Sequence, residues 1–210
     1  MQPLSAFAVE ARRAVRGVLC DIDDTVTSDG RLTAAAYDAL ERLRTAGLVV
    51  VPITGRPAGW CDHIARMWPV DAVVGENGAF YFRYDSAART MRRQFADAPQ
   101  IRAQHRTALQ AIAAEILAAV PGAAIAADQP YRETDLAIDF CEDVPPLPDA
   151  AVQHIVAIMQ SRGLTAKISS IHVNGWFGDY DKLAMTRRLF AECFDTDLDA
   201  ARAHYVFAGD

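Results

Sequence analysis

Three aspartates, Asp21, Asp23 and Asp24, stand within four positions, directly after an apolar run at residues 15–20. Carboxylates gathered at one point repel one another, so a hard cation such as Mg²⁺ is the expected neutraliser. One carboxylate can attack phosphorus, and a second, two residues along an extended chain and so on the same side, can move protons. This pairing suits Asp21 and Asp23, whereas Asp24 points elsewhere.

Other polar residues stand at the ends of predicted strands or the starts of predicted helices: Thr54, Gly55, Arg56, Lys182 and Asp210. A hydroxyl, loop amides and a lysine around one point are suited to a phosphoryl group. Hydrolysis of a phosphate monoester is so slow that enzymes accelerate it by up to about 10²¹-fold, which a lone carboxylate does not supply. A nucleophile, a cation that binds the phosphoryl group and a metal ion together give a larger rate acceleration.

The elements that must position these residues follow from the apolar pattern. Residues 15–20, 48–53 and 72–74 are apolar runs that predict strands, and apolar residues at helical spacing lie between them. Strand–helix–strand alternation at this rhythm predicts an α/β fold with a doubly wound, parallel, Rossmann-like sheet. Ligands of such sheets gather at the carboxyl ends of the strands, where Asp21 and Thr54 stand.

From about residue 80 the pattern changes to one typical of an inserted α+β domain. The predicted elements are a hairpin at 80–84 and 89–95, a helix at 101–120, strands near 123–127 and 135–140, a helix at 152–162 and strands around 165–169 and 171–176. After Asp181, a predicted helix N-cap, the first pattern resumes. We therefore expect a core of residues 1–84 and 177–210 with an inserted domain at 85–176.

Composition narrows the function classes. The net charge of −6 and the pI near 5.3 argue against a nucleic-acid binder, which usually has a basic surface. No apolar run approaches the roughly 20 residues that span a bilayer, so we expect no membrane partner. The four cysteines form no CxxC pair, which favours a reduced, cytoplasmic compartment.

Four motifs follow one another along the chain: DIDDT from Asp21, PITGRP around Thr54, GDYDKLA around Lys182, and the Gly209–Asp210 pair. In this order they resemble the signature of the haloacid dehalogenase-like phosphohydrolase superfamily. GENGA at 75–79, followed by a long insertion, is similar to the subclass with a large α/β cap (type IIB). That subclass includes sugar-phosphate phosphatases, phosphomannomutases and phosphoglycolate phosphatases. The resemblance implies a Rossmann-like core with an inserted cap domain.

The resemblance also implies a role for each matching residue. Asp21 would be the nucleophile that forms an aspartyl-phosphate and also binds Mg²⁺. Asp23 would protonate the leaving oxygen and then activate water, while its carbonyl binds the metal. Thr54 and Lys182 would hold the transferring phosphoryl group, and Asp210 would be a further metal ligand.

Some positions carry weaker or competing expectations. Gly55 and Arg56 are candidates for contact with phosphate or substrate. Asn77 is expected first to form a hairpin-type turn with Gly78, and only second to contact the substrate. In the segment from His172 through Asn174 to Trp176, the side chains could be exposed toward a substrate, but a packed Trp is favoured.

Two departures from the family pattern stand at the acidic motifs. Asp24 occupies a position where the family often has glycine. The family usually continues with a second acidic residue, so we expect the chain to be truncated after Asp210.

The sequence therefore predicts a Mg²⁺-dependent phosphoric monoester hydrolase acting on a small phosphorylated metabolite, such as a sugar phosphate or a phosphoglycolate-like compound. Two alternatives stay open: a phosphomutase of the same superfamily, and an inactive relative that only binds phosphorylated ligands. The substrate and the oligomeric state are beyond the sequence.

Overall fold

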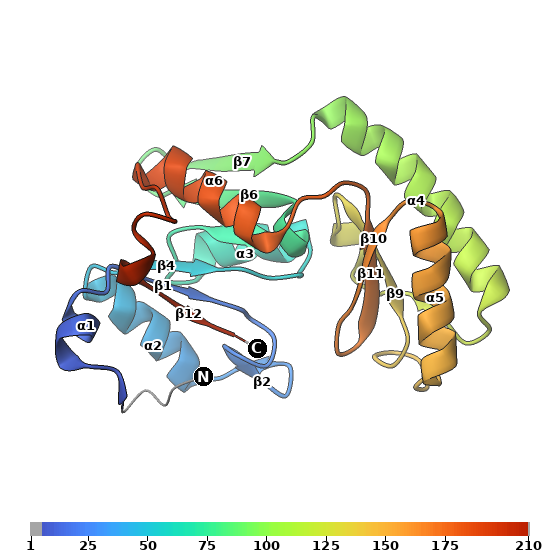
Figure 1. Ribbon diagram of the computed structural model, residues 1–210, viewed down its shortest axis with the longest axis horizontal. Helices are drawn as coiled ribbons and strands as arrows, with labels where there is room; N and C mark the ends of the chain where they lie inside the picture. Colours follow the sequence, from blue (N-terminus) through green and yellow to red (C-terminus); the bar gives the residue numbers. More distant parts are fainter. Residues whose placement is uncertain (1–5, 210) are drawn as a thin grey trace. The chain divides into compact units, whose positions relative to one another are not determined.

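The computed structural model describes residues 6–209 and shows an α/β chain divided into two compact units (Figure 1). The first unit comprises Met1–Arg56, Trp60–Ala96 and Asp181–Asp210. The second comprises Pro57–Gly59 and Asp97–Tyr180.

A parallel sheet forms the centre of the first unit, as predicted. Its strand order is β12 (Tyr205–Ala208), β1 (Gly17–Cys20) and β4 (Val49–Pro52), with both neighbours parallel to β1. A parallel bridge between Ile53 and Val74 continues this order toward β5 (Val73–Gly75). The carboxyl ends of β1 and β4 therefore meet at one edge of the sheet, which confirms the predicted fold class.

Helices cover both faces of this sheet, which is why its central strands are apolar throughout. In Figure 1, α2 (Ala34–Thr45) and α6 (Lys182–Phe194) lie on opposite sides of the sheet, and α3 (Ala58–Met67) follows β4 in the chain. On the α6 side, Leu189 and Phe190 pack with Val51 and Val74 in one buried cluster. A short helix, α1 (Val9–Arg13), precedes β1.

Local capping signals set where two helices begin. Thr33 accepts a hydrogen bond from the Ala36 amide at 3.2 Å, and Asp181 accepts one from the Ala184 amide at 2.7 Å. Side-chain oxygens at these positions pair amides of the first turn that have no partner within the helix. The predicted N-cap at Asp181 is confirmed, and it fixes the start of the helix that carries Lys182.

Antiparallel strands extend the first unit beyond the parallel sheet. The strands β6 (Phe80–Asp85) and β7 (Thr90–Phe95) form the predicted hairpin, and β6 also pairs with β5. Because β7 pairs along its whole length with β6, the first unit runs to Ala96, whereas the sequence placed the boundary after residue 84. It resumes at Asp181, later than the expected residue 177.

The segment after β1 folds into a small hairpin. The strands β2 (Thr27–Ser28) and β3 (Arg31–Leu32) pair around Asp29 and Gly30, both with positive φ. An Asp–Gly pair favours such a turn because aspartate tolerates, and glycine freely adopts, the left-handed region.

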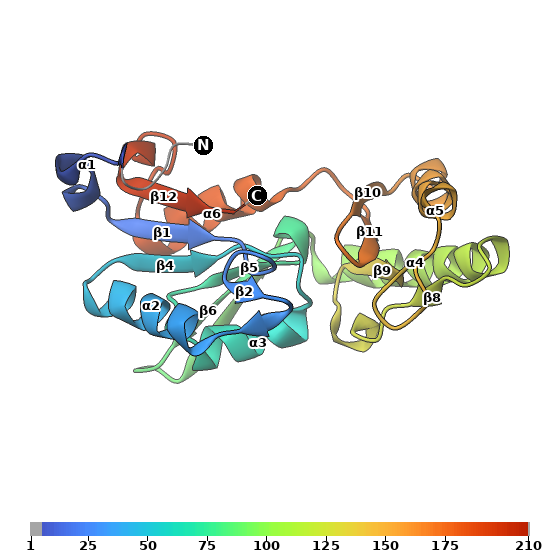
Figure 2. The same ribbon diagram turned by 90° about the horizontal axis from the view of Figure 1, so that it is seen from below.

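The second unit is an antiparallel sheet backed by two helices, seen from a second direction in Figure 2. Its strand order is β10 (Thr165–Ile168), β11 (His172–Trp176), β9 (Asp135–Asp139) and β8 (Ala124–Ile125). The helices α4 (Pro99–Ala119) and α5 (Asp149–Ser161) pack on one face through an apolar cluster. The short helix η3 (Gln129–Tyr131) precedes β9.

Side chains alternate between the two faces of this second sheet. Leu136, Ile138 and Val173 belong to the apolar cluster under the helices. Strand alternation sends His172 and Trp176 to the other face, where they are nevertheless buried. The prediction that Trp176 packs in the interior is therefore confirmed. The alternative, that the side chains of this strand are exposed, is wrong.

The connection from β5 to β6 approaches the start of α6 closely. It consists of the short helix η2 (Glu76–Gly78), so the predicted hairpin-type turn at Asn77 and Gly78 is confirmed. Gly78 has a φ of 103°, and a β-carbon there would overlap the backbone carbonyl of Asp181. Only glycine fits both constraints, and its small size lets η2 lie against the residue that caps α6.

Among the described residues, no helix combines the length and the apolar character needed to cross a bilayer.

Replacing Leu189 with alanine should destabilise the protein strongly. Leu189 is fully buried, so its truncation removes apolar contacts and leaves a cavity, at a cost of about 2–5 kcal/mol in the free energy of unfolding. Leu183 lies on the same helix and is 50% exposed, which makes Leu183→Ala the matched control. Urea denaturation of both variants measures the difference, and equal losses would contradict the packing described for α6.

Gly78→Ala should cost more stability than an ordinary glycine substitution at positive φ. Gly47 has a φ of 81°, and a β-carbon added there would meet no atom within 4 Å, so Gly47→Ala suffers only the backbone penalty. That penalty is about 1–2 kcal/mol. Gly78→Ala adds the overlap with Asp181, worth roughly a further 1–3 kcal/mol. Urea denaturation again separates the two, and indistinguishable midpoints would show that η2 and α6 do not approach this closely.

Candidate active site

Asp21 stands directly after β1, at the carboxyl edge of the parallel sheet. Its amide donates to the Ala208 carbonyl at 2.9 Å, so the backbone still follows the strand register here. The Lys182 ammonium lies 3.3 Å from Asp21 Oδ2, although 161 positions separate the two residues. The side chains are 17% and 34% exposed, so water and a small ligand can reach the pair. A partly buried carboxylate beside an ammonium is an arrangement suited to an anionic substrate.

Asp23 is held by the guanidinium of Arg56. Arg56 Nη2 donates to Asp23 Oδ1 at 2.6 Å, and Arg56 Nε donates to Oδ1 at 3.0 Å and to Oδ2 at 3.2 Å. The same guanidinium lies 4.8 Å from the ring centre of Trp60. Asp23 and Arg56 come from the loops after β1 and β4, which the parallel sheet places at one edge.

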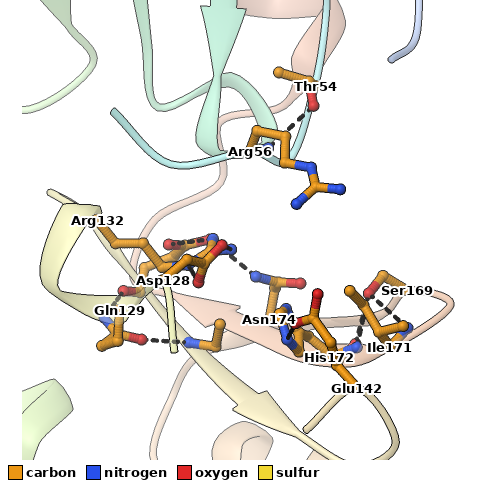
Figure 3. Close-up of polar contacts among 12 residues, drawn as sticks. Thr54, Arg56, Asp128, Gln129, Arg132, Glu142, Ser169, Ile171, His172 and Asn174 are labelled. Carbon is orange, nitrogen blue, oxygen red and sulfur yellow. Dashed lines mark hydrogen bonds and ion pairs between the residues drawn. The ribbon is translucent and has the colours of Figure 1, made fainter. Parts of the chain in front are cut away.

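Thr54 is fully buried, and its polar groups have fixed partners. Its amide donates to the Val74 carbonyl at 2.9 Å, and its carbonyl accepts from the Asn77 amide at 3.2 Å. Its hydroxyl oxygen accepts from the Arg56 amide at 3.0 Å (Figure 3). The Thr54 hydroxyl is the acceptor in that contact, so its own hydrogen is not used by it.

Gly55 and Asn77 lie beside Thr54. A β-carbon at Gly55 would stand 3.2 Å from Asn77 Oδ1, so the asparagine side chain covers the glycine. Asn77 itself has a φ of 57° within η2, a conformation that asparagine adopts more readily than most residues. The structure thus brings four of the expected phosphate contacts, Thr54, Gly55, Arg56 and Asn77, into one group.

The backbone at Asp24 accounts for the residue that the sequence left unexplained. Asp24 has a φ of 55°, in the left-handed region, and its side chain is exposed. Glycine is the usual residue for this conformation, and aspartate is among the few others that tolerate it. Asp24 therefore meets a backbone requirement that a glycine would also meet.

Cys20 precedes Asp21 but is not suited to act as a nucleophile. Burial, together with the nearby Asp21 carboxylate, raises the pKa of the Cys20 thiol to about 12. The reactive thiolate is therefore scarce at neutral pH. The nucleophile of this segment must be sought among its carboxylates.

The expected metal ligands are only partly described. Asp210 lies outside the described residues, and within those residues no group of three His, Cys, Asp or Glu side chains is placed to hold a metal ion. Asp21 and the Asp23 carbonyl offer oxygen donors alone. Mg²⁺ prefers such donors and usually keeps several water molecules, so this donor set fits it.

A second polar cluster lies in the second unit, and the sequence analysis missed it (Figure 3). Arg132 pairs with Asp128 at 2.8 Å and with Asp135 at 3.0 Å, and Asn174 donates to Asp135 Oδ2 at 3.2 Å. Burial raises the pKa of Asp135, while Arg132 and Asn174 oppose that shift. Because its members satisfy one another, we regard this cluster as part of the framework of the second unit.

The histidine of β11 is also paired. His172 Nε2 lies 2.8 Å from Glu142 Oε2, and Ser169 Oγ accepts from the His172 amide at 2.9 Å. The sequence does not predict these contacts, because strand pairing and the loop after β9 determine which residues become neighbours of His172.

Residues 18–120 match the family model of the haloacid dehalogenase-like hydrolases. A comparison with curated protein sequences finds no match.

Solved structures of low sequence identity share the fold. The chain is similar to Thermoplasma acidophilum protein 0175, with a TM-score of 0.68 and 16% identity over 92% of this chain and 76% of that one. It is similar to the C-terminal domain of C. albicans trehalose-6-phosphate phosphatase, with a TM-score of 0.66 and 13% identity over 91% and 68% of the two chains. For BT4131, a sugar phosphatase of HAD subclass IIB, the TM-score is 0.59 and the identity 13% over 92% and 80%. The sequence match over residues 18–120 and the shared fold agree, and in both respects the chain resembles the haloacid dehalogenase-like hydrolases.

Proposed function

We propose that the protein is a Mg²⁺-dependent phosphatase that hydrolyses a small phosphorylated metabolite through an aspartyl-phosphate. The observation that carries the proposal is the contact between Asp21 and Lys182 at the carboxyl edge of the parallel sheet. A nucleophile for phosphorus and a cation for the phosphoryl oxygens thereby stand side by side.

Asp21 acts in the first half of the reaction. A carboxylate oxygen attacks phosphorus and forms the new O–P bond while the bond from phosphorus to the leaving oxygen breaks. Asp23 gives its proton to that oxygen, so the product leaves as an alcohol. Lys182 reduces the charge repulsion between the Asp21 carboxylate and the approaching phosphate, which otherwise opposes the attack.

Asp23 acts again in the second half. It takes a proton from a water molecule, whose oxygen attacks phosphorus and displaces the Asp21 carboxylate. Inorganic phosphate leaves, Asp23 is protonated again, and Asp21 returns to its starting form. One carboxyl group thus serves first as an acid and then as a base.

The groups around Thr54 hold the transferring phosphoryl group. The Thr54 hydroxyl retains a hydrogen to donate, and the Lys182 ammonium adds charge-assisted donors. Gly55 and Asn77 border the same point, and the side-chain amide of Asn77 is a further group of the donor type. These donors stabilise the negative charge of the phosphoryl oxygens during transfer.

Mg²⁺ would be held by the Asp21 carboxylate and the Asp23 carbonyl, with Asp210 as a further ligand. When bound, the ion neutralises phosphoryl charge and helps to orient the group.

The second unit is the candidate for substrate selection, in the role of an inserted cap domain. Sugar phosphates are the first substrates to test because two proteins of similar fold are a trehalose-6-phosphate phosphatase and a sugar phosphatase. Phosphoglycolate is a second class, as the type IIB motifs imply.

Replacement of Asp21 with asparagine should abolish phosphate release. The amide is not a nucleophile, so turnover should fall by roughly 10³-fold or more. Asp24→Asn is the matched control, because Asp24 lies three positions away, is exposed, and has no role in the mechanism. The measurement is inorganic phosphate released from a panel of sugar phosphates and phosphoglycolate with Mg²⁺.

The same panel separates the alternatives. Formation of an isomeric phosphate without phosphate release would identify a phosphomutase. Thermal stabilisation by a phosphorylated ligand without turnover would identify an inactive binding relative. Full activity of Asp21→Asn would overturn the proposed mechanism.

A further inference from the structure

We propose that Arg56 is a positioning residue that orients the Asp23 carboxyl group for proton transfer and that it does not bind the phosphoryl group. The sequence placed Arg56 among the phosphate contacts. This inference rests on the proposed function and adds a residue to its proton-transfer step.

The first observation is the direction of the guanidinium. Two of its nitrogens, Nε and Nη2, reach Asp23 Oδ1 at 3.0 and 2.6 Å, whereas Oδ2 has only the longer 3.2 Å contact from Nε. A planar guanidinium that donates to one carboxylate oxygen through two adjacent nitrogens, and to the other oxygen through one of them, restricts the rotation of the carboxylate. Oδ1 is therefore the anchored atom, and Oδ2 is the atom left to exchange a proton with the substrate or with water.

The second observation is that Arg56 is itself held. Its amide donates to Thr54 Oγ1 at 3.0 Å, and its carbonyl accepts from the Glu76 amide at 3.1 Å. Its guanidinium lies 4.8 Å from the Trp60 ring centre, within the range of a cation–π contact. An anchor for a reacting group must have few conformations of its own, and these contacts restrict both ends of the residue.

The third observation concerns the cation available to phosphate. Lys182 already supplies an ammonium next to the proposed nucleophile, at 3.3 Å from Asp21 Oδ2. Arg56 faces the other aspartate. Each cation therefore contacts a different aspartate. Lys182 is placed to bind the phosphoryl group, and Arg56 is placed to orient the proton-transfer group.

The test uses two substrates that differ in their need for an acid. A nitrophenyl phosphate releases a stable phenolate and needs little proton donation, whereas a sugar phosphate releases an alkoxide and depends on it. The quantity to compare is kcat/KM, because it reports the first phosphoryl transfer and not the later hydrolysis that all substrates share. Arg56→Gln should lower kcat/KM for the sugar phosphate by about 10²-fold and for the aryl phosphate by only a few-fold.

A double-mutant cycle supplies the second readout. If Arg56 acts through Asp23, Arg56→Gln should have little further effect on the sugar phosphate once Asp23→Asn is present. Arg56→Lys keeps the charge but loses the forked geometry, so its activity should fall between those of the wild type and Arg56→Gln. The matched control is Arg66→Gln, which removes an arginine from the surface of α3 and should leave both substrates unaffected.

The outcomes are distinct. Equal losses on the two substrates, or full additivity with Asp23→Asn, would overturn the positioning role and return Arg56 to the phosphate contacts. A loss of kcat/KM on both substrates that is explained by lower thermal stability of the variant would also overturn it. If the wild type releases no phosphate from either substrate while Mg²⁺ is present, the proposed function itself fails, and the positioning role fails with it.

Discussion

Negative charge at the end of a buried strand is the constraint on which the first unit depends. Asp21 follows β1, which lies between two parallel neighbours, and its carboxylate is largely buried, so an unpaired charge there would be penalised. The fold supplies that cation from 161 positions away, through a helix whose start is fixed by the Asp181 cap and by the close approach of η2. The parallel register, the Asp181 cap and Gly78 together fix the positions of Asp21 and Lys182 relative to each other.

Local patterns in the sequence predict the framework well. Apolar runs and helical spacing indicated the strands β1, β4 and β5 and the helices between them, and the N-cap at Asp181 follows from one side chain and its neighbouring amides. The boundary after residue 84 was placed too early because a hairpin can belong to either neighbouring unit. Only its pairing along β6 assigns β7 to the first unit.

Contacts between distant residues could not be predicted in the same way. The pairing of Arg56 with Asp23 depends on side-chain direction across 33 positions, and nothing in their neighbouring residues specifies it. The cluster of Arg132, Asp135 and Asn174 similarly depends on which strands pair in the second sheet. By contrast, the positive φ of Asp24 has a local signal, since aspartate is among the few residues other than glycine that tolerate a left-handed backbone.

The surroundings of Thr54 have a thermodynamic consequence. Its amide, carbonyl and hydroxyl oxygen each have a backbone partner, and its side chain is branched and fully buried, so few rotamers are open to it. Ordering a mobile side chain on binding commonly costs about 0.5–1.5 kcal/mol. Thr54 is already ordered, so an anion bound as proposed would meet a rigid donor, and the side-chain entropy would be lost during folding and not during recognition.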